Sequence, residues 1–162
     1  MAFDMFLKVD GIPGESTDTK HKDQIRVLAW SWGASQSGTM HIGAGGGAGK
    51  ANFQDLSLTK YLEMSSPLLL QACATGQHID KIELFVRKAG GKDSALTYLT
   101  ITFEECLITS YSTGGSGGED LLTENISINF AKYGVAYALQ TGKGAGSGSV
   151  TTSFNIPGNT LK

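Results

Sequence analysis

Alternation of apolar and polar residues with a period of two dominates the chain. At the N-terminus, Phe3, Met5, Leu7 and Val9 fall on one face of a predicted strand, with Phe6 on the other. Because successive side chains of a strand point to opposite faces, the pattern predicts half-buried β-strands. It recurs in residues 25–32, 52–59, 80–88, 97–111 and 124–139. A last segment, residues 150–156, is predicted to be a further single strand or a tail.

The phase of the alternation slips twice. In the segment 97–111 it changes at Glu104–Glu105, which predicts a β-bulge there. In 124–139 it changes at Ala131–Lys132, which predicts another bulge or a bend. Adjacent strand residues face opposite ways, so Glu104 and Glu105 are not expected to act as an acid/base pair.

The strand at residues 25–32 has one face of large side chains, Leu28, Trp30 and Trp32. These are expected in the core, because buried aromatic side chains remove a large area from water. On the other face strict alternation places four smaller residues: Ile25, Val27, Ala29 and Ser31.

One short helix is predicted in the sequence SSPLLLQACATG, residues 65–76. Ser65 or Ser66 is the expected cap, Pro67 lies in the first turn and Gly76 follows the end. The expected apolar stripe consists of Leu68, Leu69, Ala72 and Cys73. Many antiparallel strands, one helix and no alternation of strands with helices predict a sandwich or a closed barrel.

Composition narrows the class of protein. The chain has 162 residues, which suits one domain, residues 1–162, and its 17% of charged residues favours a surface committed to other protein. A net charge of −2 without basic clusters argues against nucleic acid as a partner. Asp4 and Lys8 interrupt the N-terminal apolar stretch, so we expect no signal peptide, and no segment is apolar enough for membrane insertion. Cys73 and Cys106 are expected to be buried free thiols.

A glycine-rich segment, MHIGAGGGAGK at residues 40–50, approaches a phosphate-binding loop. Ala44, Gly49 and Lys50 fit that pattern, but Ala51 stands where the magnesium-binding hydroxyl belongs. The residues that follow alternate like a strand, whereas a phosphate loop needs a helix there. We therefore interpret the segment as an arm without a nucleotide.

A second motif, Gly114, Ser116 and Gly118, matches the G-x-S-x-G of a hydrolase nucleophile. The three histidines all precede it and are isolated, so each is expected to be exposed or locally hydrogen-bonded: His21, His41 and His78. A glycine-rich hairpin is favoured, and no cofactor, metal or catalytic residue is predicted. Two alternatives stay open: a small β-barrel hydrolase or nucleotide-binding enzyme using Ser116 or Lys50, and a monomeric ligand-binding barrel.

Four longer segments resemble one family closely, the Hcp proteins of type VI secretion systems. They are MAFDMFLKVDGIPGES, VLAWSWGASQSGTMHIGAGGGAGK, SLTKYLEMSSPLLLQACATGQH and STGGSGGEDLLTENISINFA. The resemblance covers residues 1–140, and residues 141–162 form a tail in a region where the family varies.

The resemblance implies a mainly β fold: a β-barrel of two antiparallel sheets, a flanking short α-helix and an extended glycine-rich loop, residues 40–54. It implies a structural subunit and no enzyme. Six copies would form a ring, and rings would stack into a tube inside a contractile sheath on a baseplate. Contraction would expel the tube with a spike protein. The chain would be made in the cytoplasm and secreted without a signal peptide, with effector proteins in the channel.

Two sets of residues are expected to make contacts. The resemblance implies that the ring-stacking loop would use Gly43, Gly45, Gly46, Gly47, Gly49 and Lys50. The resemblance implies a channel, and the alternation in the strand suggests its wall: the small residues opposite the tryptophans, Ala29, Ser31 and Gly33, are expected to face the channel and contact effectors. The alternative is that Ser31 faces a neighbouring subunit or solvent.

Overall fold

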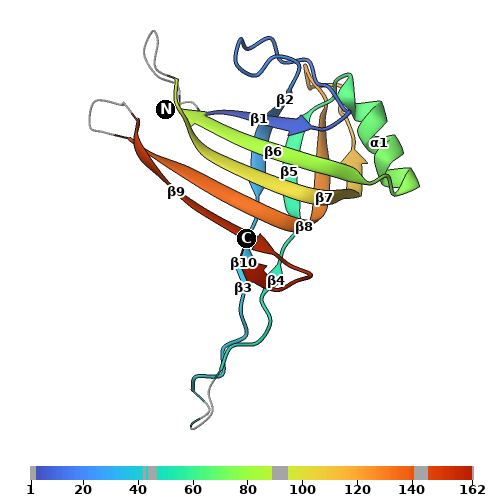
Figure 1. The fold of residues 1–162 in the computed structure, drawn as a ribbon. Coiled ribbons are helices and arrows are strands. Elements are labelled where there is room, and N and C mark those ends of the chain that lie inside the picture. The colour runs from blue at the N-terminus through green and yellow to red at the C-terminus, as the bar shows by residue number, and fades with distance from the viewer. Residues whose placement is uncertain (1–2, 42, 44–46, 89–94, 141–145, 162) are drawn as a thin grey trace.

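Six antiparallel strands close into a barrel in the computed structural model, which describes residues 3–41, 43, 47–88, 95–140 and 146–161. Around the barrel the order is β8, β5, β2, β1, β6 and β7, and β7 pairs again with β8 (Figure 1). The bounds are β1 Phe3–Val9, β2 Ile25–Ser31, β5 Leu56–Tyr61, β6 Ile79–Lys88, β7 Thr97–Thr113 and β8 Thr123–Gln140. The barrel is therefore one continuous sheet closed on itself.

Within the described residues, four further strands lie outside the closed barrel. β9 (Gly146–Asn155) continues the sheet from β8, and β10 (Thr160–Leu161) pairs with the end of β9. β3 (Ala34–Ser35) and β4 (Asn52–Phe53) form a separate two-stranded sheet. The mainly β fold is confirmed, and the strand predicted at residues 150–156 forms as part of β9, which ends at Asn155 and is paired with β8 over most of its length.

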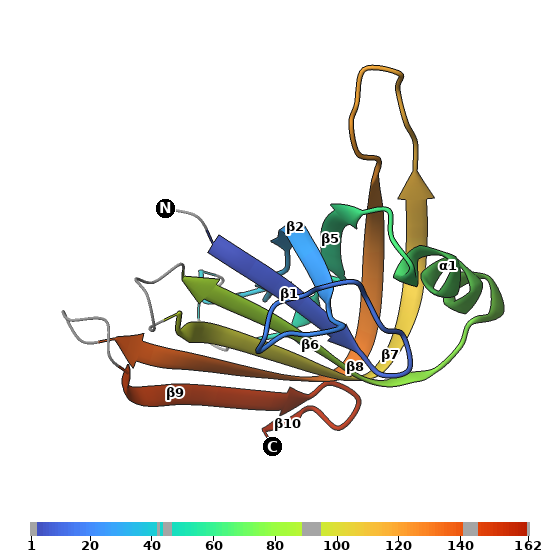
Figure 2. The same ribbon diagram turned by 90° about the horizontal axis from the view of Figure 1, so that it is seen from above.

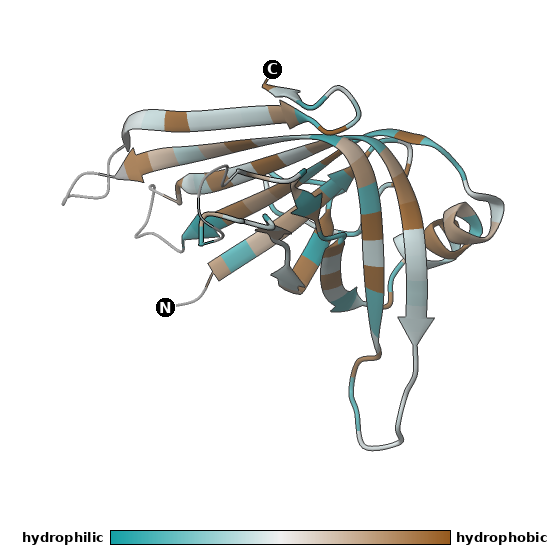
Figure 3. Ribbon diagram, turned by 90° about the horizontal axis from the view of Figure 1, so that it is seen from below, coloured by the Kyte–Doolittle hydropathy of each residue, from teal (hydrophilic) through white to brown (hydrophobic). Residues whose placement is uncertain are grey.

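Every barrel strand contributes apolar side chains to one core. Brown residues alternate with white and teal ones along the first half of β8 in Figure 3, as the period of two predicts. The fully buried apolar side chains include Leu7, Ile25, Leu56, Ile82, Phe103 and Ile128. The barrel interior is thus filled with side chains.

The two longest strands change direction together (Figure 2). One edge of β8 pairs with β7 along most of its length, from Glu124 to Tyr137. Its other edge pairs with β5 up to Ile128 and with β9 from Lys132 onward. β8 therefore exchanges β5 for β9 at the bend, which is where the closed barrel ends and the extension begins.

The predicted phase slips lie at this bend. Phe103 and Cys106 are both buried on β7, which confirms a slip between them. No bulge forms there, because the register of β7 with β8 is the same before and after Glu104–Glu105. The alternation of buried and exposed residues shifts in β7 and β8 at paired positions, so the two strands stay in register. In β7 the shift occurs at Glu105, whose φ is 56°. The bulge of this strand pair lies instead between Ile108 and Ser110.

The prediction for β2 was wrong in its first half. Ile25 and Val27 are buried in the core, whereas strict alternation put them opposite the tryptophans. The register with β5 shifts between Val27 and Ala29, and the extra residue moves Trp30 to the core side.

A covering segment, residues 13–24, lies against the outside of β1 and β6. Phe6, on the face predicted to be polar, is fully buried because the ring of His21 stacks on it at 4.4 Å between centroids. The Arg87 guanidinium binds both carboxylate oxygens of Asp18, and Nδ1 of His21 lies 2.9 Å from Oε1 of Gln24. The segment thus covers Phe6 with an aromatic stack and holds it in place with an ion pair and a hydrogen bond.

The helix α1, Ser65–Thr75, forms where it was predicted and ends at Gly76 in a left-handed conformation. Its cap differs: Met64 precedes the first turn, without a side-chain cap. Leu69 and Ala72 are buried as expected, but Leu68 is exposed. Because the helix begins at Ser65, neither serine stands at the cap position, and the Ser66 hydroxyl donates instead to Glu124 of a buried ion pair.

Candidate assembly surfaces

An arm, residues 34–53, projects from one end of the barrel (Figure 1). It begins earlier than the expected loop 40–54, because β3 and β4 pair at its base. A second bridge joins Gly38 to Ala48, and Thr39 exchanges hydrogen bonds of 3.0–3.1 Å with Gly47. The arm is therefore a hydrogen-bonded ribbon.

The structure describes four of the six residues expected in the ring-stacking loop; Gly45 and Gly46 lie outside the described residues. Gly43 has a φ of 71°, a conformation that favours glycine. A Cβ at Gly49 would come within 2.5 Å of the Ser37 hydroxyl, so the two sides of the ribbon approach closely there. Lys50 is exposed beside it.

A face of small uncharged residues covers the outside of β2, β5 and the first half of β8. Ala29 and Ser31 are exposed on β2, and their partners on β5 are Thr59 and Ser57. Those residues pair in turn with Asn125 and Ser127 on β8. We call this set the small-residue face: Ala29, Ser31, Ser57, Thr59, Asn125 and Ser127. It forms a shallow hollow in the sheet.

Gly33 lies beyond the end of β2, close to the side chain of Gln54, and is not part of this face. The neighbouring Trp32 packs edge-on against Phe103 and Tyr133, at 5.3 and 5.1 Å between ring centroids. The tryptophans therefore contact the core as predicted, although both remain partly exposed.

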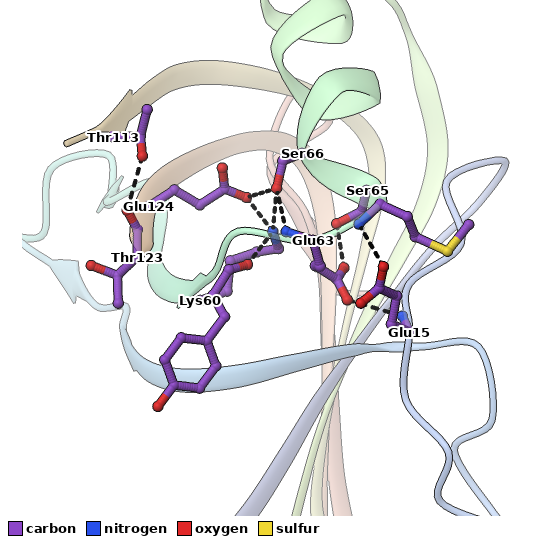
Figure 4. A network of polar contacts seen from close by, with 10 residues as sticks. Glu15, Lys60, Glu63, Ser65, Ser66, Thr113, Thr123 and Glu124 are labelled. Atoms are coloured by element: carbon purple, nitrogen blue, oxygen red, sulfur yellow. Dashed lines mark hydrogen bonds and ion pairs between the residues drawn. The ribbon is translucent and has the colours of Figure 1, made fainter. Parts of the chain in front are cut away.

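A second hollow of about 360 Å³ lies at the other end of β5. Its two carboxylates join the covering segment to the start of α1: the Glu15 N–H donates to the Glu63 carboxylate, and the Met64 N–H donates to the Glu15 carboxylate (Figure 4). We call it the end hollow, and its lining is Glu15, Ser16, Thr17, Arg26, Tyr61, Leu62, Glu63 and Leu121.

The motif residues of the enzyme alternatives do not meet. Ser116 is exposed in the loop between β7 and β8, and its carbonyl accepts a hydrogen bond from the Glu119 N–H. His21 is buried as part of the covering segment, and His78 is exposed, with its imidazole 3.5 Å from the Asp80 carboxylate. Within the described ranges, no three His, Cys, Asp or Glu residues are placed to hold a metal ion.

The two thiols are free. Cys106 is buried as predicted, and burial raises the pKa of its thiol to about 12, which keeps it protonated and unreactive. Cys73 is only half-buried, so that part of the prediction was wrong.

The fold and its surfaces define a structural barrel with a projecting arm, and sequence comparison names its family. The chain belongs to the Hcp family of type VI secretion system proteins: the family model described as "Type VI secretion system effector, Hcp" matches residues 6–137. This is a family of structural, secreted tube proteins and not of enzymes.

The relatives cover the chain almost completely. Protein hcp1 of Pseudomonas aeruginosa is 54% identical over 160 residues, which are 98% of each chain. The crystal structure of Hcp1 from Salmonella typhimurium is 36% identical, covers all of both chains and has a TM-score of 0.83. A structure titled "Structure of a type six secretion system protein" is 32% identical, covers 99% of this chain and 100% of the other, and has a TM-score of 0.93.

In the described part of the chain no helix is long and apolar enough to cross a membrane.

Proposed function

We propose that residues 1–162 act as one domain, the subunit of a six-membered ring that stacks into the inner tube of a type VI secretion system. The arm is the observation that carries this proposal. All described residues from Ser35 to Lys50 are exposed, so this part of the arm contributes nothing to the core of its own barrel; only Phe53, at the base of the arm, packs against that core. A hydrogen-bonded ribbon that projects without covering its own barrel is suited to contact a second copy. Gly43, Gly45, Gly46, Gly47, Gly49 and Lys50 would form this contact.

The small-residue face is the proposed wall of the channel. Its side chains carry no charge, and the Thr59 hydroxyl is hydrogen-bonded to Asn125 at 2.7 Å. A wall whose polar groups are partly paired binds cargo weakly, so effector proteins could be held and released. Ala29 and Ser31 belong to this wall. Gly33 lies beyond the end of β2 and outside the small-residue face, so it would contact cargo only at the edge of the wall.

We propose the remaining partners because the chain resembles the Hcp tube proteins. The proposed tube lies in a contractile sheath on a baseplate and carries a spike protein at its end. The chain is made in the cytoplasm and leaves with the expelled tube, without a cleaved signal peptide.

Deleting Gly45–Gly49 tests the arm. The barrel should stay folded, because the described residues between Ser35 and Lys50 are exposed, and single rings should form. Stacked tubes should disappear in electron micrographs, and secretion of the protein should fall. Normal tubes and normal secretion of the shortened chain would contradict the assignment.

A further inference from the structure

The arm and the end hollow lie at opposite ends of one strand. β4 of the arm leads into β5 at Leu56, and β5 ends at Tyr61, which lines the hollow. Six residues of extended chain span roughly 20 Å. Figure 2 looks onto the end that carries the hollow, with the arm pointing away from the viewer. A contact between these two surfaces of different copies would therefore join copies end to end.

The rim of the hollow is apolar and exposed. Leu62 and Leu122 are joined by a backbone hydrogen bond of 2.9 Å, and Leu121 beside them is 61% exposed. Met64 is also about half exposed at the start of α1. Four large apolar side chains at one place on the surface are typical of an interaction site.

The arm offers a matching apolar group. Met40 lies near its tip and is 78% exposed. A methionine side chain is flexible and adapts to irregular apolar surfaces, so it fits a shallow rim made by leucines.

The charges of the two surfaces are opposite. The hollow contains the carboxylates of Glu15 and Glu63 against the single guanidinium of Arg26. Residues 34–53 include no Asp or Glu and carry Lys50 and His41. Because the two carboxylates are fixed by backbone N–H groups, the acidic surface is formed before anything binds.

We propose that the end hollow is the receptor for the arm of a second copy of this chain. Met40 of one copy lies between Leu62 and Leu121 of the next, and Lys50 faces the Glu15–Glu63 carboxylates. Such a contact uses two different surfaces and repeats without limit along one axis. This inference rests on the proposed stacking function and adds the residues that receive the arm.

Cross-linking tests the contact. In a Cys73→Ser background, Met40→Cys and Leu121→Cys are combined in one chain, with each single variant as a control, and the full-length protein is oxidised. The double variant should give a ladder of covalent oligomers on a denaturing gel, because every copy bonds to the next. Each single variant should give at most a dimer.

Charge substitution gives a second readout. Leu121→Asp and Met40→Asp should each reduce the number of rings per tube at least tenfold in electron micrographs and leave single rings intact. Val150→Asp is the control, since Val150 on β9 is 64% exposed and lies outside the hollow. Stacked rings without a ladder, and unaffected by Leu121→Asp, would overturn the receptor assignment and leave the stacking function standing. Wild-type rings that never stack would overturn both.

Discussion

Lys60 and Glu124 form an ion pair in which neither side chain is exposed to solvent. They are direct cross-strand partners of β5 and β8. The Lys60 ammonium also donates to the Tyr61 carbonyl at 3.0 Å and to the Ser66 hydroxyl at 3.2 Å. Ser66 donates in turn to Glu124 at 2.8 Å (Figure 4). The pair therefore ties the first turn of α1 to the barrel, next to the end hollow.

Breaking this pair should be more costly than replacing it. Lys60→Met or Glu124→Leu alone leaves one buried charge without its partner, and each should lower the free energy of unfolding by about 3–5 kcal/mol. The double variant Lys60→Met/Glu124→Leu should lie within about 2 kcal/mol of the wild type, since it buries apolar groups instead. Urea denaturation at one fixed protein concentration measures all three. Additive losses in the double variant would show that the pair is not coupled.

The alternation along the chain already indicates that Lys60 and Glu124 face the core. Leu56, Leu58 and Lys60 share one face by strict alternation, as do Glu124, Ile126 and Ile128. A charge of each sign at a core-facing position on two strands indicates a buried pair. Pairing Lys60 with Glu124 also requires knowing that β5 and β8 are neighbours in the sheet. The alternation within each strand does not give the order of the strands.

Asp18 should make stability depend on pH in acid. Hydrogen bonds from the Arg87 guanidinium lower the pKa of this carboxyl from 3.8 to about 2. A carboxyl whose pKa is lower in the folded state stabilises the fold above the unfolded pKa and loses that contribution as pH falls through the folded pKa. Between pH 4 and pH 2 the wild type should thus lose stability on the order of 2 kcal/mol from this group.

Asp18→Asn tests that assignment by denaturation at a series of pH values. The variant should be less stable at pH 7 and show a flatter profile between pH 4 and pH 2. Asp80→Asn is the matched control, because Asp80 is 89% exposed and lies far from Arg87 in the sheet. If the free energy of unfolding of Asp18→Asn fell between pH 4 and pH 2 as steeply as that of the wild type, other carboxyls would be responsible for the loss of stability in acid.

Ser31→Gln tests the proposed wall of the channel. Ser31 is exposed on the small-residue face opposite Ser57, so a larger amide fits without disturbing the core. Rings should form normally, and the amount of effector that co-purifies with them should change several-fold. Ser149→Gln on β9, also exposed and outside this face, should leave cargo unchanged. Broken rings in Ser31→Gln would place Ser31 at the contact between neighbouring subunits.

The alternation of apolar and polar residues predicted the strands better than it predicted their bulges and the residues buried outside the core. The slips of β7 and β8 were visible because two buried residues stand three apart, as at Phe103 and Cys106. The bulge of β2 was not, because Ile25, Val27 and Leu28 are all apolar and fit either face. Burial of Phe6 depends on a segment that folds back over it, which the alternation within β1 cannot report.

Of the two proposed contact surfaces, the sequence predicted the arm but not the end hollow. The arm was predicted from its glycines, but its start at Ala34 depends on the pairing of β3 with β4. The end hollow combines residues from four separate parts of the chain, around Glu15, Arg26, Leu62 and Leu121. No single segment carried a pattern for it, so only the closed fold reveals it.

The central claim is that this barrel is the subunit of a closed ring of six. Size-exclusion chromatography with light scattering at micromolar concentration tests it most directly. The account predicts a particle of about six times the chain mass of 17.1 kDa, seen as closed rings by electron microscopy. A compact species at the mass of one chain, unchanged as the concentration is raised, would contradict it.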